Sequence, residues 1–220
     1  MNNKLSIIIP TYNRLNYLKK TLGDLKKQLN DDMEIIVYVN KSKDETRKYY
    51  NHIKKDKNFK DLNFFFQKKN VGPIQNLYDS MEKAKHDYVL ILSDDDQVEI
   101  GFIDRVLKLI NEFPEVGVFL HKKNFPQKKN KFKYSLVPKG KQAVYKCFVH
   151  TASLPGTIYK RKYLKKGYLK KLKITNLYPQ LYYIAKIAEK YDVMLVTYDK
   201  QILMAKNSNK LKKKQIAKYN

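Results

Sequence analysis

The first 120 residues alternate short apolar runs with longer amphipathic stretches, and this alternation constrains the fold more than any other feature. The apolar runs have the length and aliphatic content of buried strands, whereas the longer stretches repeat leucine or isoleucine at helical spacing. Strands that alternate with helices form right-handed crossovers, which produce a mostly parallel sheet covered on both faces. We therefore predict an α/β fold with strands at residues 5–9, 34–39, 62–66, 87–92 and 116–120 and helices at residues 14–29, 43–57, 73–85 and 101–112.

The pattern becomes irregular after residue 120. Residues 122–140 are polar, lysine-rich and interrupted by prolines, so we expect a loop or a short hairpin there. A helical stripe follows at residues 178–191, and short apolar runs predict strands at residues 156–159, 192–196 and 201–204. No internal repeat and no strong interdomain linker is evident in the sequence. The length suits one sizeable domain, alone or with a small appendage.

The chain is strongly basic, with 46 lysines and arginines against 21 acidic residues and a net charge of +25. Only Glu189, Asp192 and Asp199 among the acidic residues lie beyond Glu115, so the second half presents a nearly unopposed cationic surface. Such a field concentrates polyanions, whether anionic lipid headgroups, nucleic acid or phosphorylated substrates. A general lysine bias that only solvates the surface is the alternative, although it does not explain why the excess is confined to one half.

Cysteine content and hydropathy favour a cytoplasmic protein. Cys147 is the only cysteine, so an internal disulfide is excluded and we expect this thiol to pack in the interior. No stretch approaches the ~20 apolar residues that cross a bilayer. The apolar run at residues 5–9 is too short for the core of a signal peptide.

Three adjacent carboxylates, Asp94, Asp95 and Asp96, follow directly after the apolar run Tyr88–Leu92. In open α/β sheets, ligands bind beyond the carboxyl ends of the strands, which is where this triplet is expected to lie. The carboxylates repel one another, and a divalent cation held together with phosphate oxygens would offset that repulsion. A solvated acidic turn before the helix that begins near Ile100 is the competing interpretation.

Two further motifs accompany the triplet. The segment Leu5–Arg14, with the sequence LSIIIPTYNR, resembles the opening of the family 2 inverting glycosyltransferases, which have the GT-A fold. Asn70-Val71-Gly72, then Asn76, then residues 87–96 resemble a later part of the same family at its usual spacing. The resemblance covers Lys4 to Leu120 and weakens afterwards. It implies a Rossmann-like, mostly parallel nucleotide-binding sheet with flanking helices and a smaller, irregular acceptor-side part at the C-terminus.

The resemblance also implies a site. In the family, the turn after the first strand and the loop after the second hold the nucleobase and ribose, and the acidic triplet contacts the ribose and a metal on the diphosphate. Carried over by position, Asp95 and Asp96 would hold Mn²⁺ or Mg²⁺. The nucleotide-sugar-binding residues implied in the same way are Pro10, Thr11, Tyr12, Arg14, Asn40, Asn70, Gly72, Asn76, Asp94 and Asp95.

The chain departs from the family pattern at two points. Val39 stands where the family usually has an aspartate that accepts a hydrogen bond from the base, and Asn40 beside it can still accept through its amide oxygen. Inverting transfer also needs a base to remove the proton of the acceptor hydroxyl, and relatives often supply it from an acidic pair in the second half. Residues 176–180 of this chain contain no acid there. Asp96, if it is free of the metal, and His150 are candidates, and the base stays unassigned.

The function implied is a metal-dependent inverting glycosyltransferase. It would move a sugar from a nucleotide diphosphate sugar, with a UDP-sugar favoured, to a glycan or a polyprenyl-diphosphate-linked acceptor in the biosynthesis of capsule, lipooligosaccharide or a related surface polysaccharide. We assign residues 1–120 to the nucleotide-sugar-binding half, 121–205 to an acceptor-binding half of the same domain and 206–220 to a basic tail. The basic C-terminal half is expected to dock peripherally on the anionic inner face of the cytoplasmic membrane.

Other functions remain open at this point. A nucleotidyltransferase-like enzyme would need a glycine-rich phosphate loop near the first strand, and Pro10–Arg14 contains no glycine. A basic, non-enzymatic nucleic-acid-binding protein would place aromatic residues among lysines on a defined platform, yet the sequence has no recognised motif of that class and we expect no nucleic-acid partner. An inactive glycosyltransferase is a further alternative, because Val39 replaces an acid and no base is evident.

Overall fold

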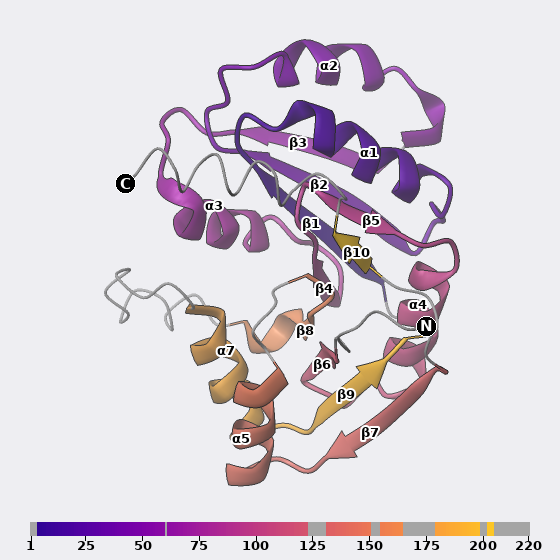
Figure 1. Cartoon of the computed structure of the whole chain (residues 1–220), viewed down its shortest axis with the longest axis vertical. Coiled ribbons are helices and arrows are strands. Elements are labelled where there is room, and N and C mark those ends of the chain that lie inside the picture. The colour runs from indigo at the N-terminus through magenta and orange to yellow at the C-terminus, as the bar shows by residue number, and fades with distance from the viewer. Residues whose placement is uncertain are drawn as a thin grey trace.

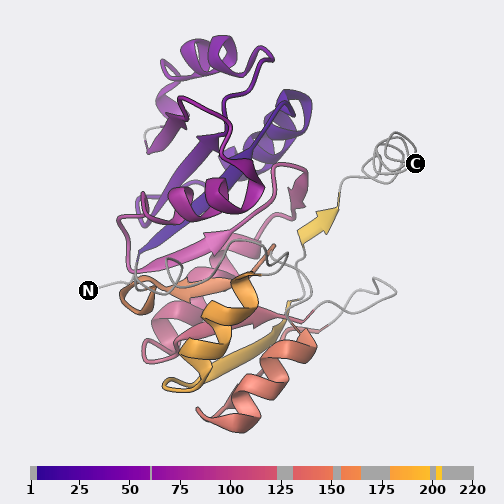
Figure 2. The same ribbon diagram turned by 90° about the vertical axis from the view of Figure 1, so that its left-hand side faces the viewer.

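An eight-stranded sheet runs through the protein, with helices on both faces (Figures 1 and 2). The computed structural model describes residues 4–59, 61–122, 131–150, 155–164, 179–198 and 202–204. The strand order is β3-β2-β1-β4-β8-β6-β9-β7. The strands are β1 (Leu5–Thr11), β2 (Met33–Val39), β3 (Leu62–Phe66), β4 (Tyr88–Ile91), β6 (Val118–His121), β7 (Lys133–Val137), β8 (Ile158–Lys160) and β9 (Val193–Thr197).

The helices confirm most of the predicted periodicity. They are α1 (Leu15–Lys26), α2 (Thr46–Ile53), α3 (Gly72–Met81), α4 (Phe102–Glu112), α5 (Lys141–His150) and α7 (Pro179–Ala188), with short 3-10 turns η1 (Lys57–Phe59) and η2 (Arg161–Tyr163). The second helix begins later than the predicted start at residue 43, so Ser42 does not cap it. The helix α2 begins at Thr46, and the Ser42 hydroxyl oxygen instead accepts a hydrogen bond from the Asn13 N–H at 2.9 Å.

The first half of the sheet is entirely parallel, as predicted. Strand β1 lies between β2 and β4, with Leu5 opposite both Met33 and Tyr88, and β3 extends the sheet beyond β2. The central strands are buried on both faces because helices cover each side. This confirms the predicted α/β class with a mostly parallel central sheet.

Two hydrophobic cores lie on opposite faces of the sheet. Along β1, Leu5, Ile7 and Ile9 pack into one core, whereas Ile8 packs into the other, which is the period-two alternation of a strand. Helices α1, α2 and α4 contribute buried side chains to the first core, and α3, α5 and α7 contribute to the second. Figure 2 views the sheet with α3 and α7 in front of it. Each fully buried aliphatic side chain contributes about 1.5–3 kcal/mol.

The second half of the sheet is mixed. Strand β8 lies antiparallel between β4 and β6, β6 and β9 are parallel, and β7 lies antiparallel to β9 at the edge. The strands predicted at 156–159 and 192–196 are therefore confirmed with slightly shifted bounds. The expected loop or hairpin at 122–140 contains β7, which pairs with β9 and is mostly exposed, so its sequence lacks a strand's apolar run.

Helix α5 was not predicted from the sequence. Ala143 and Cys147 are its only buried residues, so its buried face lacks the large apolar side chains that mark a core-facing helix. The burial of Cys147 confirms the packing role expected for this thiol. None of the helices in the described ranges is long and apolar enough to cross a membrane.

A separate two-stranded sheet joins distant parts of the chain. Strand β5 (Asp96–Val98) pairs antiparallel with β10 (Ile202–Met204), which places Met204 opposite Asp96. The strand predicted at 201–204 is thus confirmed, but its partner was not foreseen. The acidic triplet therefore leads into a strand rather than into a fully solvated turn.

Candidate functional site

The carboxyl ends of β1, β2 and β4 lie together at one edge of the parallel sheet. The Thr11 hydroxyl donates a hydrogen bond to Oδ2 of Asp94 at 2.7 Å, which joins the end of β1 to the turn after β4. The Asn40 N–H donates to the Thr11 carbonyl at 2.9 Å, which joins the loop after β2 to the same point. Residues 83 positions apart in the sequence therefore share one edge, where α/β folds bind ligands.

A guanidinium group links the first two carboxylates of the triplet. Arg14 lies 3.2 Å from Oδ1 of Asp94 and 2.6 Å from Oδ2 of Asp95. The Asp94 carboxyl is nearly inaccessible, and this burial raises its pKa to about 6, although the charge of Arg14 and the Thr11 hydrogen bond act in the opposite direction. The two carboxylates are thus close enough to share one cationic group.

The third carboxylate has a different environment. Oδ2 of Asp96 accepts a hydrogen bond from the Ser93 N–H at 2.8 Å, and the residue is 2% exposed. This bond closes the turn that presents Asp94 and Asp95. Asp96, expected among the metal ligands and as a candidate base, therefore uses one carboxylate oxygen within the turn.

Thr21 supports this turn from helix α1, and sequence reasoning missed it. Its buried hydroxyl lies 2.9 Å from the Asp94 carbonyl oxygen and 2.8 Å from that of Asp96. A threonine between Leu18 and Leu22 on the buried face of a helix is the signal that could have found it. Because buried hydroxyls find hydrogen-bond partners, such a residue indicates a polar backbone segment packed against the helix.

A second network organises the loop after β2 and the start of α3. Nδ2 of Asn40 donates to Oδ1 of Asn70 at 2.9 Å, and Oδ1 of Asn40 accepts from the Val71 N–H at 2.9 Å. Gly72 follows with a φ of +81°, a conformation that favours glycine. Asn40 therefore has a structural role that the sequence did not predict, because it links the two loops through both atoms of its amide.

Asn76 lies one turn further along α3 and is 2% exposed. Its Nδ2 donates to the Tyr38 carbonyl at 3.0 Å, whereas its Oδ1 has no hydrogen-bond partner among the described residues. An unpaired buried oxygen is costly, so this amide is a polar group with capacity for one more donor.

Hydrogen bonds also join the loop after β1 to the loop after β2. Oδ1 of Asn13, which has a φ of +54°, accepts from the Lys43 N–H at 2.6 Å, and Oδ2 of Asp44 accepts from the Leu15 N–H at 3.0 Å. These bonds fix the turn that carries Pro10, Tyr12 and Arg14. The Tyr12 side chain, in this turn after β1, is 41% exposed.

The residues fit a divalent cation in part. Asp94 and Asp95 already share one cationic partner, and carboxylate oxygens are the ligands that Mg²⁺ and Mn²⁺ prefer. Within the described ranges, no cluster of three or more His, Cys, Asp or Glu residues gathers in a metal-binding arrangement. The chain thus offers two carboxylates, which suits a cation that completes its shell with water and substrate phosphates.

The candidate bases lie in different surroundings. His150 ends helix α5 and is half-buried, and burial together with the charges of Lys122 and Lys146 lowers its pKa. Residues 151–154 and 165–178, which include most of the segment 176–180, lie outside the described residues. The catalytic base stays unassigned.

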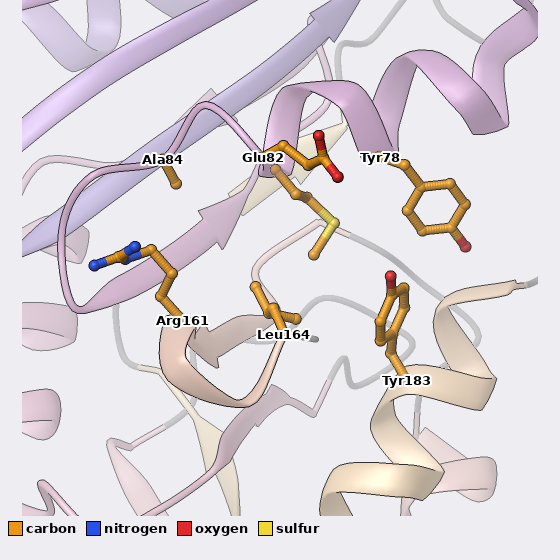
Figure 3. Close-up of a pocket in the computed structure, with 7 residues that line it drawn as sticks. Tyr78, Glu82, Ala84, Arg161, Leu164 and Tyr183 are labelled. Atoms are coloured by element: carbon orange, nitrogen blue, oxygen red, sulfur yellow. The ribbon is translucent and has the colours of Figure 1, made fainter. Parts of the chain in front are cut away.

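A small cavity of about 120 Å³ lies elsewhere, between the end of α3 and helix α7 (Figure 3). Its lining includes Tyr78, Glu82, Arg161 and Tyr183. Arg161 donates from its backbone to Asp87 and from Nε to His86, which places the cavity near the start of β4. The carboxylates follow the other end of that strand, so this cavity does not belong to their site.

Comparison with known proteins decides the family. The profile described as Glycosyl transferase family 2 matches residues 6–168. This chain belongs to that family. A similar curated protein is the GalNAc(5)-diNAcBac-PP-undecaprenol beta-1,3-glucosyltransferase of Campylobacter jejuni, with 32% identity over 109 residues. The match covers 50% of this chain and 35% of that relative, so the chain spans about a third of its length.

Solved structures show the same fold. TarS of S. aureus matches with a TM-score of 0.69 at 22% identity, over 96% of this chain and 62% of the TarS chain. TarS in complex with UDP-GlcNAc matches with a TM-score of 0.61 at 22% identity, over 87% and 58%. The mannosyltransferase PcManGT of Pyrobaculum calidifontis, in complex with GDP-Man and Mn²⁺, matches with a TM-score of 0.53 at 15% identity, over 74% and 46%. The fold of this chain is therefore that of GT-A glycosyltransferases.

Proposed function

We propose that this chain is the catalytic part of a glycosyltransferase that transfers a sugar from a UDP-sugar to a lipid-linked glycan in the biosynthesis of a bacterial surface polysaccharide. The observation that carries the proposal is the cluster of Thr11, Arg14, Asp94 and Asp95 at the carboxyl edge of the parallel sheet. Family membership supports the reaction type, and the undecaprenol-linked acceptor of the Campylobacter relative supports the acceptor class.

Donor binding is assigned to the loops at this edge. The turn after β1 and the loop after β2 form one wall, which the Asn13 and Asp44 hydrogen bonds hold in place. The Asn40–Asn70 bond positions the start of α3 beside them, with Gly72 free of a side chain that would obstruct a ligand. Pro10, Tyr12 and Asn76 complete this proposed surface, and the TarS complex with UDP-GlcNAc supports a UDP-sugar as donor.

Asp94 and Asp95 are the residues that would hold Mn²⁺ or Mg²⁺. The bound cation would act as a Lewis acid that stabilises negative charge on the diphosphate leaving group. Arg14 contacts the same two carboxylates and contributes positive charge at the same edge. Thr21 and Asp96 keep the turn in shape, because both bond its backbone. Inversion at the anomeric carbon requires a base on the acceptor side, for which Asp96 and His150 stay candidates.

The basic C-terminal half is proposed to bring the enzyme to its acceptor. Lipid-linked acceptors lie at a membrane surface, and the inner leaflet of the cytoplasmic membrane is anionic. The excess of lysine beyond Glu115 has the charge to bind such a surface peripherally. We therefore assign the protein to the cytoplasm and to the inner face of this membrane, with a polyprenyl-diphosphate-linked glycan as acceptor.

A binding experiment tests the donor and metal together. The chain is incubated with UDP-GlcNAc, UDP-glucose, UDP-galactose or GDP-mannose, with Mn²⁺ or with a chelator, and the unfolding temperature is measured. One UDP-sugar with Mn²⁺ should raise that temperature, because a ligand that binds only the folded state stabilises it. The chelator should remove the shift. If no nucleotide sugar stabilises the chain under either condition, the proposal is wrong.

A further inference from the structure

Helix α5 presents large apolar side chains to solvent. Tyr145 is 70% exposed, Phe148 is 53% exposed and Val149 is 57% exposed. Their spacing of three and four residues places them on one face of the helix. Apolar side chains that gather on an exposed face mark an interaction surface more often than isolated ones do. We call these three residues the outer face of α5.

The packing of α5 explains why this face is unusual. The helix contacts α7 and β6 through small or short side chains, and Ala143 and Cys147 are its buried residues. The largest apolar side chains therefore point away from the core, the reverse of an ordinary core-facing helix. Figures 1 and 2 place α5 at the end of the molecule remote from α1 and α2, where it packs against α7.

The charge around this face is positive. Lys141 and Lys146 are exposed on α5, and the helix contains no acidic residue. Lys122, which follows β6, lies close enough to the end of the helix that its charge acts on His150. Lysines beside exposed aromatic side chains are typical of helices that lie at a membrane interface, where aromatic rings insert at the level of the headgroups.

We propose that the outer face of α5 docks on a bilayer containing anionic phospholipid, with Tyr145, Phe148 and Val149 inserted and the lysines on the headgroups. Charge complementarity selects a lipid surface, since Lys141 and Lys146 lie on the same helix as the apolar face and basic residues near a leaflet each strengthen binding. The proposal deepens the proposed function, on which it rests for the lipid-linked acceptor, by naming the surface that reaches the membrane.

Vesicle sedimentation tests this docking with the full chain. Vesicles of phosphatidylglycerol and phosphatidylcholine should bind the wild type, and vesicles of phosphatidylcholine alone should bind it weakly. The double variant Tyr145→Ser/Phe148→Ser should lose affinity for the anionic vesicles by about tenfold, because the inserted apolar area is removed. Lys146→Glu should weaken binding most at low salt, since its contribution is electrostatic.

The matched control is an aliphatic side chain of equal exposure. Val149 and Ile100 are both 57% exposed, but Ile100 lies before α4, away from α5. Val149→Ser should reduce sedimentation about threefold, whereas Ile100→Ser should leave it unchanged. Circular dichroism melting of each variant confirms that it is folded. Equal binding by the wild type and the double variant overturns the proposal. So does self-association, measured by analytical ultracentrifugation, that the double variant abolishes while vesicle binding persists.

The same samples distinguish this inference from the proposed function. Nucleotide-sugar binding depends on the carboxylate edge and should be unchanged in all α5 variants. A chain that binds vesicles through α5 but binds no nucleotide sugar overturns the proposed function alone. A chain that binds a nucleotide sugar but does not sediment with vesicles overturns the docking proposal and the membrane attachment, and leaves the assigned donor chemistry standing.

Discussion

The two halves of the sheet are built in different ways. In the parallel half, β1, β2 and β3 are each followed by a helix that returns over the sheet before the next strand begins. In the mixed half, β8 lies between β4 and β6, and β9 lies between β6 and β7. Neighbouring strands there come from distant parts of the sequence.

This difference determines in which half of the sheet the functional residues can be predicted from the sequence. In the parallel half, each strand ends beside the others at one edge, so polar residues that follow apolar runs meet there. Thr11, Asn40 and Asp94 are joined in this way by hydrogen bonds. The mixed half supplies few such regularities, and its exposed α5 surface follows from packing alone. The parallel half thus carries the proposed donor chemistry and the mixed half the proposed membrane contact.

The largest effect on UDP-sugar affinity is expected for a substitution among the carboxylates of the parallel half. Asp95→Asn should reduce the affinity for a UDP-sugar with Mn²⁺ by about a hundredfold, because a charged ligand to the cation and a partner of Arg14 are both lost. Isothermal titration calorimetry measures the affinity. Asp104→Asn, which changes an exposed acid in the first turn of α4, is the control and should have no effect. Equal affinities for the two variants would remove Asp95 from the site.

A substitution in the mixed half should affect stability without affecting the donor. A Cβ at Gly117 would lie 2.6 Å from Cγ2 of Ile187 and 2.8 Å from Cβ of Tyr191. Gly117→Ala should therefore lower the free energy of unfolding by about 1–3 kcal/mol through overpacking against α7. Urea denaturation measures this change, and calorimetry should show an unchanged affinity for the UDP-sugar. A large loss of affinity would mean that the halves are coupled.

Removing the Asn40 hydrogen bonds between the loop after β2 and the start of α3 should affect both the stability and the affinity for the UDP-sugar. Asn40→Ala deletes the bonds to Asn70 and to the Val71 N–H. We expect a loss of about 1–2 kcal/mol in the free energy of unfolding, together with weaker UDP-sugar binding, because two hydrogen bonds are lost at a nearly buried position. Asn51→Ala, at an exposed position of α2, is the matched control and should change stability by less than about 0.5 kcal/mol. Urea denaturation measures the free energy of unfolding of both variants, and equal values would contradict the prediction.

The smallest expected effect is a gain of stability in the parallel half. Gly23 lies inside α1, and a Cβ there would meet no atom within 4 Å. Gly23→Ala should raise the free energy of unfolding by about 0.5–1 kcal/mol, because alanine favours the helix. Gly117→Ala is the same chemical change, but it is expected to lower the free energy of unfolding rather than raise it. A destabilised Gly23→Ala variant would show that the surroundings of α1 are tighter than the packing indicates.

Much of the fold could be predicted because local patterns and global topology agree in the parallel half. The strands at 5–9 and 34–39 are long, aliphatic and separated by an amphipathic helix, so few other arrangements bury them. Helix α5 and strand β7 were missed for the opposite reason: one buries only small side chains and the other is a mostly exposed edge strand. Hydrophobic periodicity does not reveal an element whose buried face carries few large apolar side chains.

For the site, the sequence predicted the residue types and their order along the chain, but it did not predict their contacts. Asp94 and Asp95 were predicted together, yet their shared bond to Arg14 and the separate bond of Asp96 to Ser93 depend on backbone geometry. Thr21 supports the turn from 73 residues away, a separation that no local pattern spans.

The sequence by itself determined the fold class, the mostly parallel character of the sheet and the family resemblance, because these follow from hydrophobic periodicity and from motifs in fixed order. Only the tertiary structure decided which carboxylates share a cationic partner, that β10 returns to pair with β5 beside Asp96, and that α5 exposes its aromatic face. The physical reason is that long-range packing and hydrogen bonds choose among the arrangements that local preferences allow.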